Sequence, residues 1–266
     1  MKRYFPILLI LLFFIPSLAC SIVIPANPNA VRGSGKIETQ TLDLSDFNSV
    51  SLENSGDVYI EQGQSESVTV EADDNILPLL ETNVQGKELV LSTKPNQSID
   101  PSRRIVYRIT VKDLSGISLS GSGDFHVGPI QSASMKISVP GSGNINLDDL
   151  STGQLSMDLN GSGNINIDKL KATGIDASVN GSGDIQLAGE APTQKISFRG
   201  SGNYRTGDLK SESAEIDIPG SADVTVWVTD TLKAHINGSG TVRYYGRPTV
   251  DQNGNGSGKL VSLGEK

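Results

Sequence analysis

The triplet Gly-Ser-Gly recurs along this chain at an almost constant interval. Its first glycines are Gly121, Gly141, Gly161, Gly181, Gly200, Gly238 and Gly256, and Gly220-Ser221-Ala222 fills the one remaining repeat position. The steps between them are 20, 20, 20, 19, 20, 18 and 18 residues. Repeats of this length, with short strands between turns, are typical of β-solenoids, in which each repeat forms one coil stacked on the next.

Apolar residues alternate with polar ones on both sides of each triplet. In the repeat that starts at Gly141, the apolar positions include Ile145, Leu147, Met157 and Leu159. This period of two predicts β-strands with one buried face. A third apolar column stands seven residues after the second glycine of the triplet, at Ile130, Leu150, Leu170 and Leu209. Three stacked columns predict a narrow core that a single coil cannot bury, so that only the stack is stable.

The glycines suit the corners of such a coil for two reasons. Glycine reaches positive φ without steric cost, and it lets the backbones of stacked corners approach closely. An Asn or Asp that follows the triplet suits the same turn and predicts a ladder of side chains along the stack. These residues are Asp124, Asn144, Asn164, Asp184, Asn203 and Asp223. Calcium-binding Gly/Asp repeats have a nine-residue period, which does not fit an interval near twenty, so we predict no metal and no cofactor.

The N-terminus predicts export. Lys2 and Arg3 precede an apolar segment, residues 5–15, that is too short to span a bilayer, and small residues follow it, so residues 1–19 are predicted to be a signal peptide. Cys20 comes next and is the only cysteine, so it has no intramolecular disulfide partner.

Ser17-Leu18-Ala19-Cys20 resembles a bacterial lipobox, although Ser17 stands where that motif usually has Leu, Ile or Val. The resemblance implies that Cys20 is lipidated and anchors the protein to a membrane of the cell envelope. The alternative is simple secretion with an incidental thiol. Residues 20–35 are rich in Pro, Asn and Gly and predict a flexible tether.

The rest of the chain, residues 36–266, is predicted to be a single all-β domain. Residues 116–266 carry the repeats as coils of about 18–20 residues. Residues 36–115 contain strand patterns without a clear period, and Asn54-Ser55-Gly56 matches a triplet with Asn in place of the first glycine. We expect this part to form a less regular cap on one end of the solenoid, because a terminal coil must cover its strand edges.

With these segments in view, the chain resembles the family of auto-transporter adhesins with a head GIN domain, from bacterial envelopes. The resemblance rests on residues 54–58, the turn at residues 84–89, residues 109–116 and the repeated Gly-Ser-Gly-Asn-Ile-Asn segments at 141 and 161. It covers residues 50–240 and implies a right-handed parallel β-helix and a role in adhesion. The family offers no catalytic motif to carry over.

Composition narrows the choice of partner. The chain has a formal net charge of −8, and loss of Lys2 and Arg3 with the signal peptide would make it −10. Nucleic-acid binding requires a concentrated basic surface, so nucleic acid is not an expected partner.

The outward column three residues after each triplet is predominantly uncharged and amide-rich. It comprises His126, Asn146, Asn166, Gln186, Arg205, Thr225 and Arg243. A catalytic site of a glycan-active β-helix would gather carboxylates on one face, and this column contains none, so we predict that the protein is not an enzyme. His126 and His235 are expected to be solvated surface residues.

Three hypotheses follow. The first is a tethered binding or adhesion module that contacts an envelope or host glycan or protein through Asn146, Asn166, Gln186 and Arg205, with Trp227 as an aromatic anchor. The second is a structural envelope protein without a specific ligand, and the third, least favoured, is a glycan-active enzyme. Trp227 has outward parity, and an exposed tryptophan either anchors a partner or packs beneath a neighbouring loop.

Overall fold

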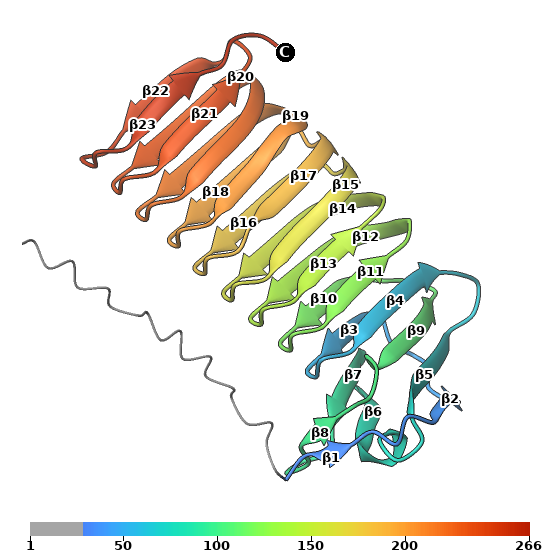
Figure 1. The fold of residues 1–266 in the computed structure, drawn as a ribbon. Coiled ribbons are helices and arrows are strands. Elements are labelled where there is room, and N and C mark those ends of the chain that lie inside the picture. Colours follow the sequence, from blue (N-terminus) through green and yellow to red (C-terminus); the bar gives the residue numbers. More distant parts are fainter. Residues whose placement is uncertain (1–28) are drawn as a thin grey trace, which may run out of the picture.

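The computed structural model describes residues 29–266, and strands dominate them (Figure 1). The predicted signal peptide and Cys20 lie outside the described residues. Within those residues the one helical element is a short 3-10 turn, η1 (Leu77–Leu79). The strands stack into an elongated β-solenoid with a more irregular end near the N-terminus, as predicted (Figure 1).

Two sheets of parallel strands form the long sides of the solenoid. The first face consists of β4 (Asp57–Gln62), β11 (Asp124–Val127), β13 (Asn144–Leu147), β15 (Asn164–Lys171), β17 (Ile185–Glu190), β21 (Thr241–Tyr245) and β23 (Lys259–Ser262). The second face consists of β3 (Ser49–Leu52), β10 (Gly116–Leu119), β12 (Ile130–Val139), β14 (Leu150–Leu159), β16 (Gly174–Val179), β18 (Thr193–Phe198) and β22 (Thr249–Asn253). β19 (Asn203–Ile218) and β20 (Asp223–Ile236) are long enough to contribute to both faces.

Register follows the repeat. Ile145 of β13 pairs with Ile165 of β15, and Met157 of β14 pairs with Ala177 of β16, one repeat further along the chain in each case. The third predicted column forms a short additional side, where Leu150 pairs with Leu170. Apolar residues therefore stack on apolar residues, and the predicted core columns are buried along the solenoid.

The N-terminal part caps one end of this stack. β3 and β4 continue the two faces with parallel partners, β7 (Glu88–Thr93) and β9 (Val106–Val111). Antiparallel strands then finish the sheets, with β2 (Ile37–Leu42) and β5 (Ser67–Asp73) following β9, and β6 (Leu80–Gln85) following β7. The sequence predicted a cap but did not predict this change of strand direction.

The prediction of a flexible tether is wrong for residues 31–35, which are held in the cap. β1 (Val31–Arg32) pairs with β8 (Ile99–Asp100). Asp73 is fully buried and accepts hydrogen bonds from the backbone N–H groups of Gly35 and Ser102, at 2.7 and 2.9 Å. These contacts fix the chain to the cap from residue 31 onward.

All buried apolar residues of the described chain lie between Phe47 and Val242. The cap and the solenoid therefore both contribute to the core.

The last coil is less apolar than the others. Gln252 pairs with Ala234, and Ser262 pairs with Tyr244, at positions that are apolar in the coils before. A coil whose core positions are partly polar tolerates water on its open side.

The triplet glycines are required for close stacking, and the expectation of positive φ is wrong. The positive-φ glycines are Gly35, Gly86, Gly189, Gly246, Gly254 and Gly264, and none begins or ends a repeat triplet. A Cβ on Gly161 would instead lie 1.8 Å from the carbonyl oxygen of Gly141, and one on Gly181 would lie 1.8 Å from that of Gly161. Each corner therefore rests directly on the backbone of the corner before it.

The predicted side-chain ladder is present beside the triplets. Asn144 Nδ2 donates to Asp124 Oδ1 at 2.8 Å, and Asn164 Nδ2 donates to Asn144 Oδ1 at 2.8 Å. Further along, Asn203 Nδ2 donates to Asp184 Oδ1 at 2.7 Å. These bonds satisfy polar groups at the corner and tie successive coils together.

One coil carries a buried polar network that the sequence analysis did not predict. The Oη of Tyr204 donates to Gln194 Oε1 at 2.9 Å, and Gln194 Nε2 donates to Ser211 Oγ at 2.6 Å. Burial raises the pKa of the Tyr204 hydroxyl, so the ring stays neutral and acts as a donor. The network is satisfied internally, which avoids the cost of an unpaired buried polar group.

Candidate binding face

The predicted polar column forms a continuous row on the first face. Asn146 pairs in register with Asn166, Asn166 with Gln186, and Gln186 with Arg205. Neighbouring strands lie roughly 4.8 Å apart, so these side chains project at that interval along the solenoid axis. The row continues through Thr225 to Arg243. The structure therefore brings together four of the five predicted site residues.

The row extends further toward the cap than predicted. His126 pairs with Tyr59 of β4, and Tyr59 pairs with Arg108 of β9. The rings of Tyr59 and His126 are stacked with centroids 4.8 Å apart, and the Arg108 guanidinium lies 5.0 Å from the centre of the Tyr59 ring. The signal for Tyr59 was the Asn54-Ser55-Gly56 corner, which places it at the same offset as His126.

The amide side chains in the middle of the row differ in the hydrogen bonds that they form. Within residues 29–266, the side chains of Asn146 and Gln186 form no hydrogen bond, and Gln186 is exposed. Asn166 Nδ2 donates to Asp168 Oδ1 at 2.7 Å, whereas its Oδ1 has no hydrogen-bond partner among the described residues. The row therefore presents amide donors and acceptors that the protein does not satisfy itself.

Arg205 is held in place by a carboxylate. Its Nη1 lies 2.7 Å from Asp184 Oδ2. Partial burial opposes ionisation of Asp184, but hydrogen bonds from Asn203 and Arg205 outweigh it and lower the pKa of this carboxyl. Asp184 thus stays charged at neutral pH and orients the guanidinium toward the row.

The first face is hollowed beside this row. A groove of about 340 Å³ is lined by side chains of the row and by residues of the C-terminal coils. The side chains that define it are Asn166, Asp168, Gln186, Arg205, Tyr245 and Lys266. Asn146 stands outside the groove, one coil further toward the cap.

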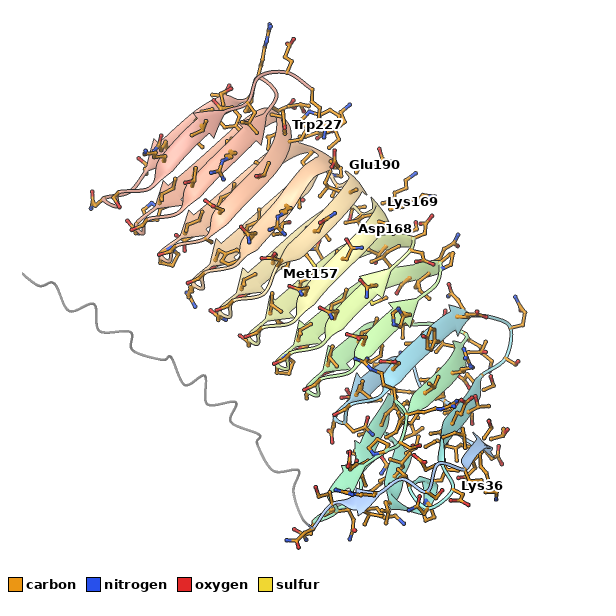
Figure 2. All side chains as sticks on the ribbon, viewed as in Figure 1. Lys36, Met157, Asp168, Lys169, Glu190 and Trp227 are labelled. Carbon is orange, nitrogen blue, oxygen red and sulfur yellow. The ribbon has the colours of Figure 1, made fainter. Side chains whose placement is uncertain are left out.

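Trp227 does not belong to the same row. It pairs in register with Lys210 on one side and Tyr245 on the other, and it is half-buried. Lys266 Nζ lies 5.5 Å from the centre of its ring and 5.2 Å from that of Tyr245. Trp227 lies with Asp168, Lys169 and Glu190 along one long edge of the solenoid (Figure 2). The Trp227 side chain is therefore only partly exposed, and the Lys266 ammonium group lies over its ring.

The other features that bear on the candidate site are metal-binding geometry in the described residues and the two histidines that the sequence singles out. No group of three or more His, Cys, Asp or Glu side chains in residues 29–266 is arranged to hold a metal ion. His126 and His235 lie on opposite faces, the first stacked on Tyr59 and the second 2.7 Å from the amide of Asn237. Among these residues, no helix has the length and apolar character needed to cross a bilayer.

These features define a β-solenoid with a polar, partly aromatic row of side chains on its first face, which is the candidate binding face. The chain belongs to the family described as putative auto-transporter adhesin, head GIN domain, whose model matches residues 46–248. The resemblance inferred from the sequence is confirmed, and the family points to an extracellular or envelope location. No curated protein matches the chain.

Solved structures support the same fold. A putative lipid binding protein from Parabacteroides distasonis ATCC 8503 is 26% identical with a TM-score of 0.82, and the match covers 88% of this chain and 99% of that one. A putative adhesin from Parabacteroides merdae ATCC 43184 is 25% identical with a TM-score of 0.82, over 88% and 99% of the two chains. A putative adhesin from Parabacteroides distasonis ATCC 8503 is 25% identical with a TM-score of 0.80, over 88% and 100%. None of these descriptions names an enzyme.

Proposed function

We propose that the protein is a non-catalytic, membrane-tethered binding module of the bacterial cell envelope, and that the first face contacts a glycan. The observation that supports this most directly is the row of amide side chains at Asn146, Asn166 and Gln186. Within the described residues, Asn146 and Gln186 form no side-chain hydrogen bond and Asn166 forms only one. Amide groups both donate and accept hydrogen bonds, as sugar hydroxyls do, so their chemistry is matched. The stacked Tyr59 and His126 rings supply an apolar surface at one end of the row.

An extended ligand suits this geometry better than a small one. The groove beside Gln186 is open to solvent, and the row continues from it toward the cap through Asn146 and His126. Each contact contributes little, but a polymer that crosses several coils makes many of them. Several anchored copies on one surface add avidity, because the second binding event becomes effectively intramolecular.

Replacing Asn146, Asn166 and Gln186 together by alanine is expected to lower glycan retention at least tenfold. Three amide contacts, each with a net value of about 0.5–1.5 kcal/mol, account for such a loss. The measurement is retention of residues 29–266 on immobilised envelope polysaccharides, with host-matrix proteins in parallel. The melting temperature should change little, because the three side chains point away from the core and only Asn166 forms a hydrogen bond, to the exposed Asp168.

A matched control replaces three serines of the second face, Ser138, Ser178 and Ser197, by alanine and should retain binding. Retention that survives both the triple amide change and Trp227→Ala would place the site elsewhere on the molecule. Retention on matrix protein but not on polysaccharide would make the ligand a protein. A parent that binds neither would leave the structural envelope protein as the function.

Anchoring is tested separately at Cys20, which lies outside the described residues. Cys20→Ser in the full chain is expected to move the protein from the membrane fraction to the soluble fraction of the producing bacterium. The reason is that the cysteine thiol carries the lipid, and stable attachment requires more than one acyl chain, as a lipoprotein has. Mass spectrometry of the parent should find acyl groups on Cys20. A soluble parent that starts at Cys20 with a free thiol would show that the protein is simply secreted.

A further inference from the structure

A second groove lies on the opposite side of the solenoid from the row of amides. It is formed by the C-terminal coils of the second face, across β18, β19, β20 and β22, and its volume is about 690 Å³. Two columns of outward side chains line it. The first column is Lys195, Glu215, Lys233 and Asp251, and the second is Ser197, Asp217, His235 and Asn253.

The charges of the first column alternate strictly. Lys195 pairs in register with Glu215, Glu215 with Lys233, and Lys233 with Asp251. All four side chains are exposed, and within residues 29–266 none of them forms an ion pair. The first face differs, because its Arg205 and Arg243 are paired with Asp184 and Asp223 at 2.7 and 3.5 Å. The second groove thus exposes an ordered set of unpaired charges of both signs.

Such a column is complementary to itself when it is reversed. A two-fold axis parallel to the strands, midway between β19 and β20, places Glu215 opposite Lys233 of a second copy and Lys195 opposite Asp251. Each contact occurs twice, which gives four ion pairs. The same axis places Asp217 opposite His235 of the second copy, so the second column is complementary as well.

Other arrangements of two copies are disfavoured by charge. A two-fold axis along the length of the solenoid would set Lys195 against Lys195 and Glu215 against Glu215. A shift of the transverse axis by half a strand spacing, onto Lys233, would set Lys233 against its own copy and Glu215 against Asp251. Like charges in contact are costly, so the pattern specifies both the orientation and the register.

We propose that the second face is a self-association surface, on which two copies of this chain pack antiparallel through Lys195, Glu215, Lys233 and Asp251. The contact is isologous, as expected for a closed dimer. It is polar and involves only the four strands β18, β19, β20 and β22, so we expect pairing to be weak in solution and salt-dependent.

The antiparallel orientation has a functional consequence, which rests on the proposed tethering through Cys20. The described chain starts in the cap, at one end of the elongated solenoid (Figure 1). The two-fold axis would place the caps of the two copies at opposite ends of the dimer. Anchors that extend from opposite ends attach to two different surfaces. Paired copies would therefore bridge neighbouring membranes, and many weak contacts between two surfaces would add.

The test uses two charge variants of residues 29–266 and sedimentation equilibrium up to millimolar protein. The acidic variant carries Lys195→Glu and Lys233→Glu, and the basic variant carries Glu215→Lys and Asp251→Lys. We expect the parent to form dimers at about 20 mM salt and to dissociate at about 500 mM. Each variant alone should remain monomeric, and an equimolar mixture of the two should form dimers again. Unchanged melting temperatures establish that both variants are folded.

Three results would overturn the proposal: a parent that stays monomeric at low salt, variants that associate as the parent does, or a mixture that stays monomeric. Glycan retention should be unchanged in both variants, because the amide row is on the other face. Sedimentation of residues 29–266 depends neither on a glycan nor on Cys20. Failure of the glycan proposal or of the anchoring proposal can therefore be distinguished from failure of the self-association proposal.

Discussion

Gly161→Val is expected to destabilise the protein by roughly 3 kcal/mol or more, with a fall in the melting temperature of many degrees. A Cβ at this position would lie 1.8 Å from the carbonyl oxygen of Gly141, and backbone atoms of the corner below surround it. Neither corner can move alone, because each is hydrogen-bonded to the next, for example from Ser162 N to Gly141 O at 3.1 Å. Gly161→Ala should already show most of the effect, since the clash is with the first side-chain carbon.

Gly128→Ala is the matched control. Gly128 has an ordinary φ, and the nearest atom to an added Cβ is the carbonyl oxygen of Ile60 at 3.6 Å. This variant should stay within about 1 kcal/mol of the parent. Chemical denaturation of the three variants measures the difference. Equal midpoints for Gly161→Ala and Gly128→Ala would show that the corner does not require close stacking.

Leu159→Ala is expected to cost about 2–5 kcal/mol of the free energy of unfolding. Leu159 is completely buried and stacks between Val139 and Val179 in the apolar column of the second face. Its Cδ2 also lies under the next corner, 3.1 Å from where a Cβ of Gly183 would be. Truncation therefore opens a cavity that the rigid corner above it cannot fill.

Ser162→Ala, three residues further along the chain, provides the comparison for Leu159→Ala. The Ser162 side chain is exposed and forms no hydrogen bond within the described part of the chain, so the change should be nearly neutral. Thermal melts of the two variants separate the contributions of core and corner. If the Leu159→Ala and Ser162→Ala proteins had the same melting temperature, the model of a core built from stacked apolar columns would be contradicted.

The Gly-Ser-Gly repeat predicts the fold but not the function, and its serines show why. Their glycine neighbours are fixed by the backbone of the adjacent coil, but Ser162 touches nothing that requires a hydroxyl. When a triplet recurs along one chain because stacked coils require it, the recurrence identifies a solenoid. It gives no information about a ligand. The ladder at Asp124, Asn144 and Asn164 is likewise uninformative about a ligand, because these side chains form hydrogen bonds with one another at the corner.

The sequence by itself determined the solenoid, its interval, its three apolar columns and the outward row at Asn146, Asn166 and Gln186. All of these follow from periodicity, because identical coils place equivalent residues directly above one another. Only the tertiary structure decided how the cap closes with antiparallel strands and that Lys266 covers Trp227. It also decided that the triplet glycines serve close approach and not positive φ. The closure of the cap and the Lys266 contact involve segments that share no period, so only the path of the chain in space sets them. The conformation of the triplet glycines depends on backbone geometry at the corners, which the spacing of the repeat does not specify.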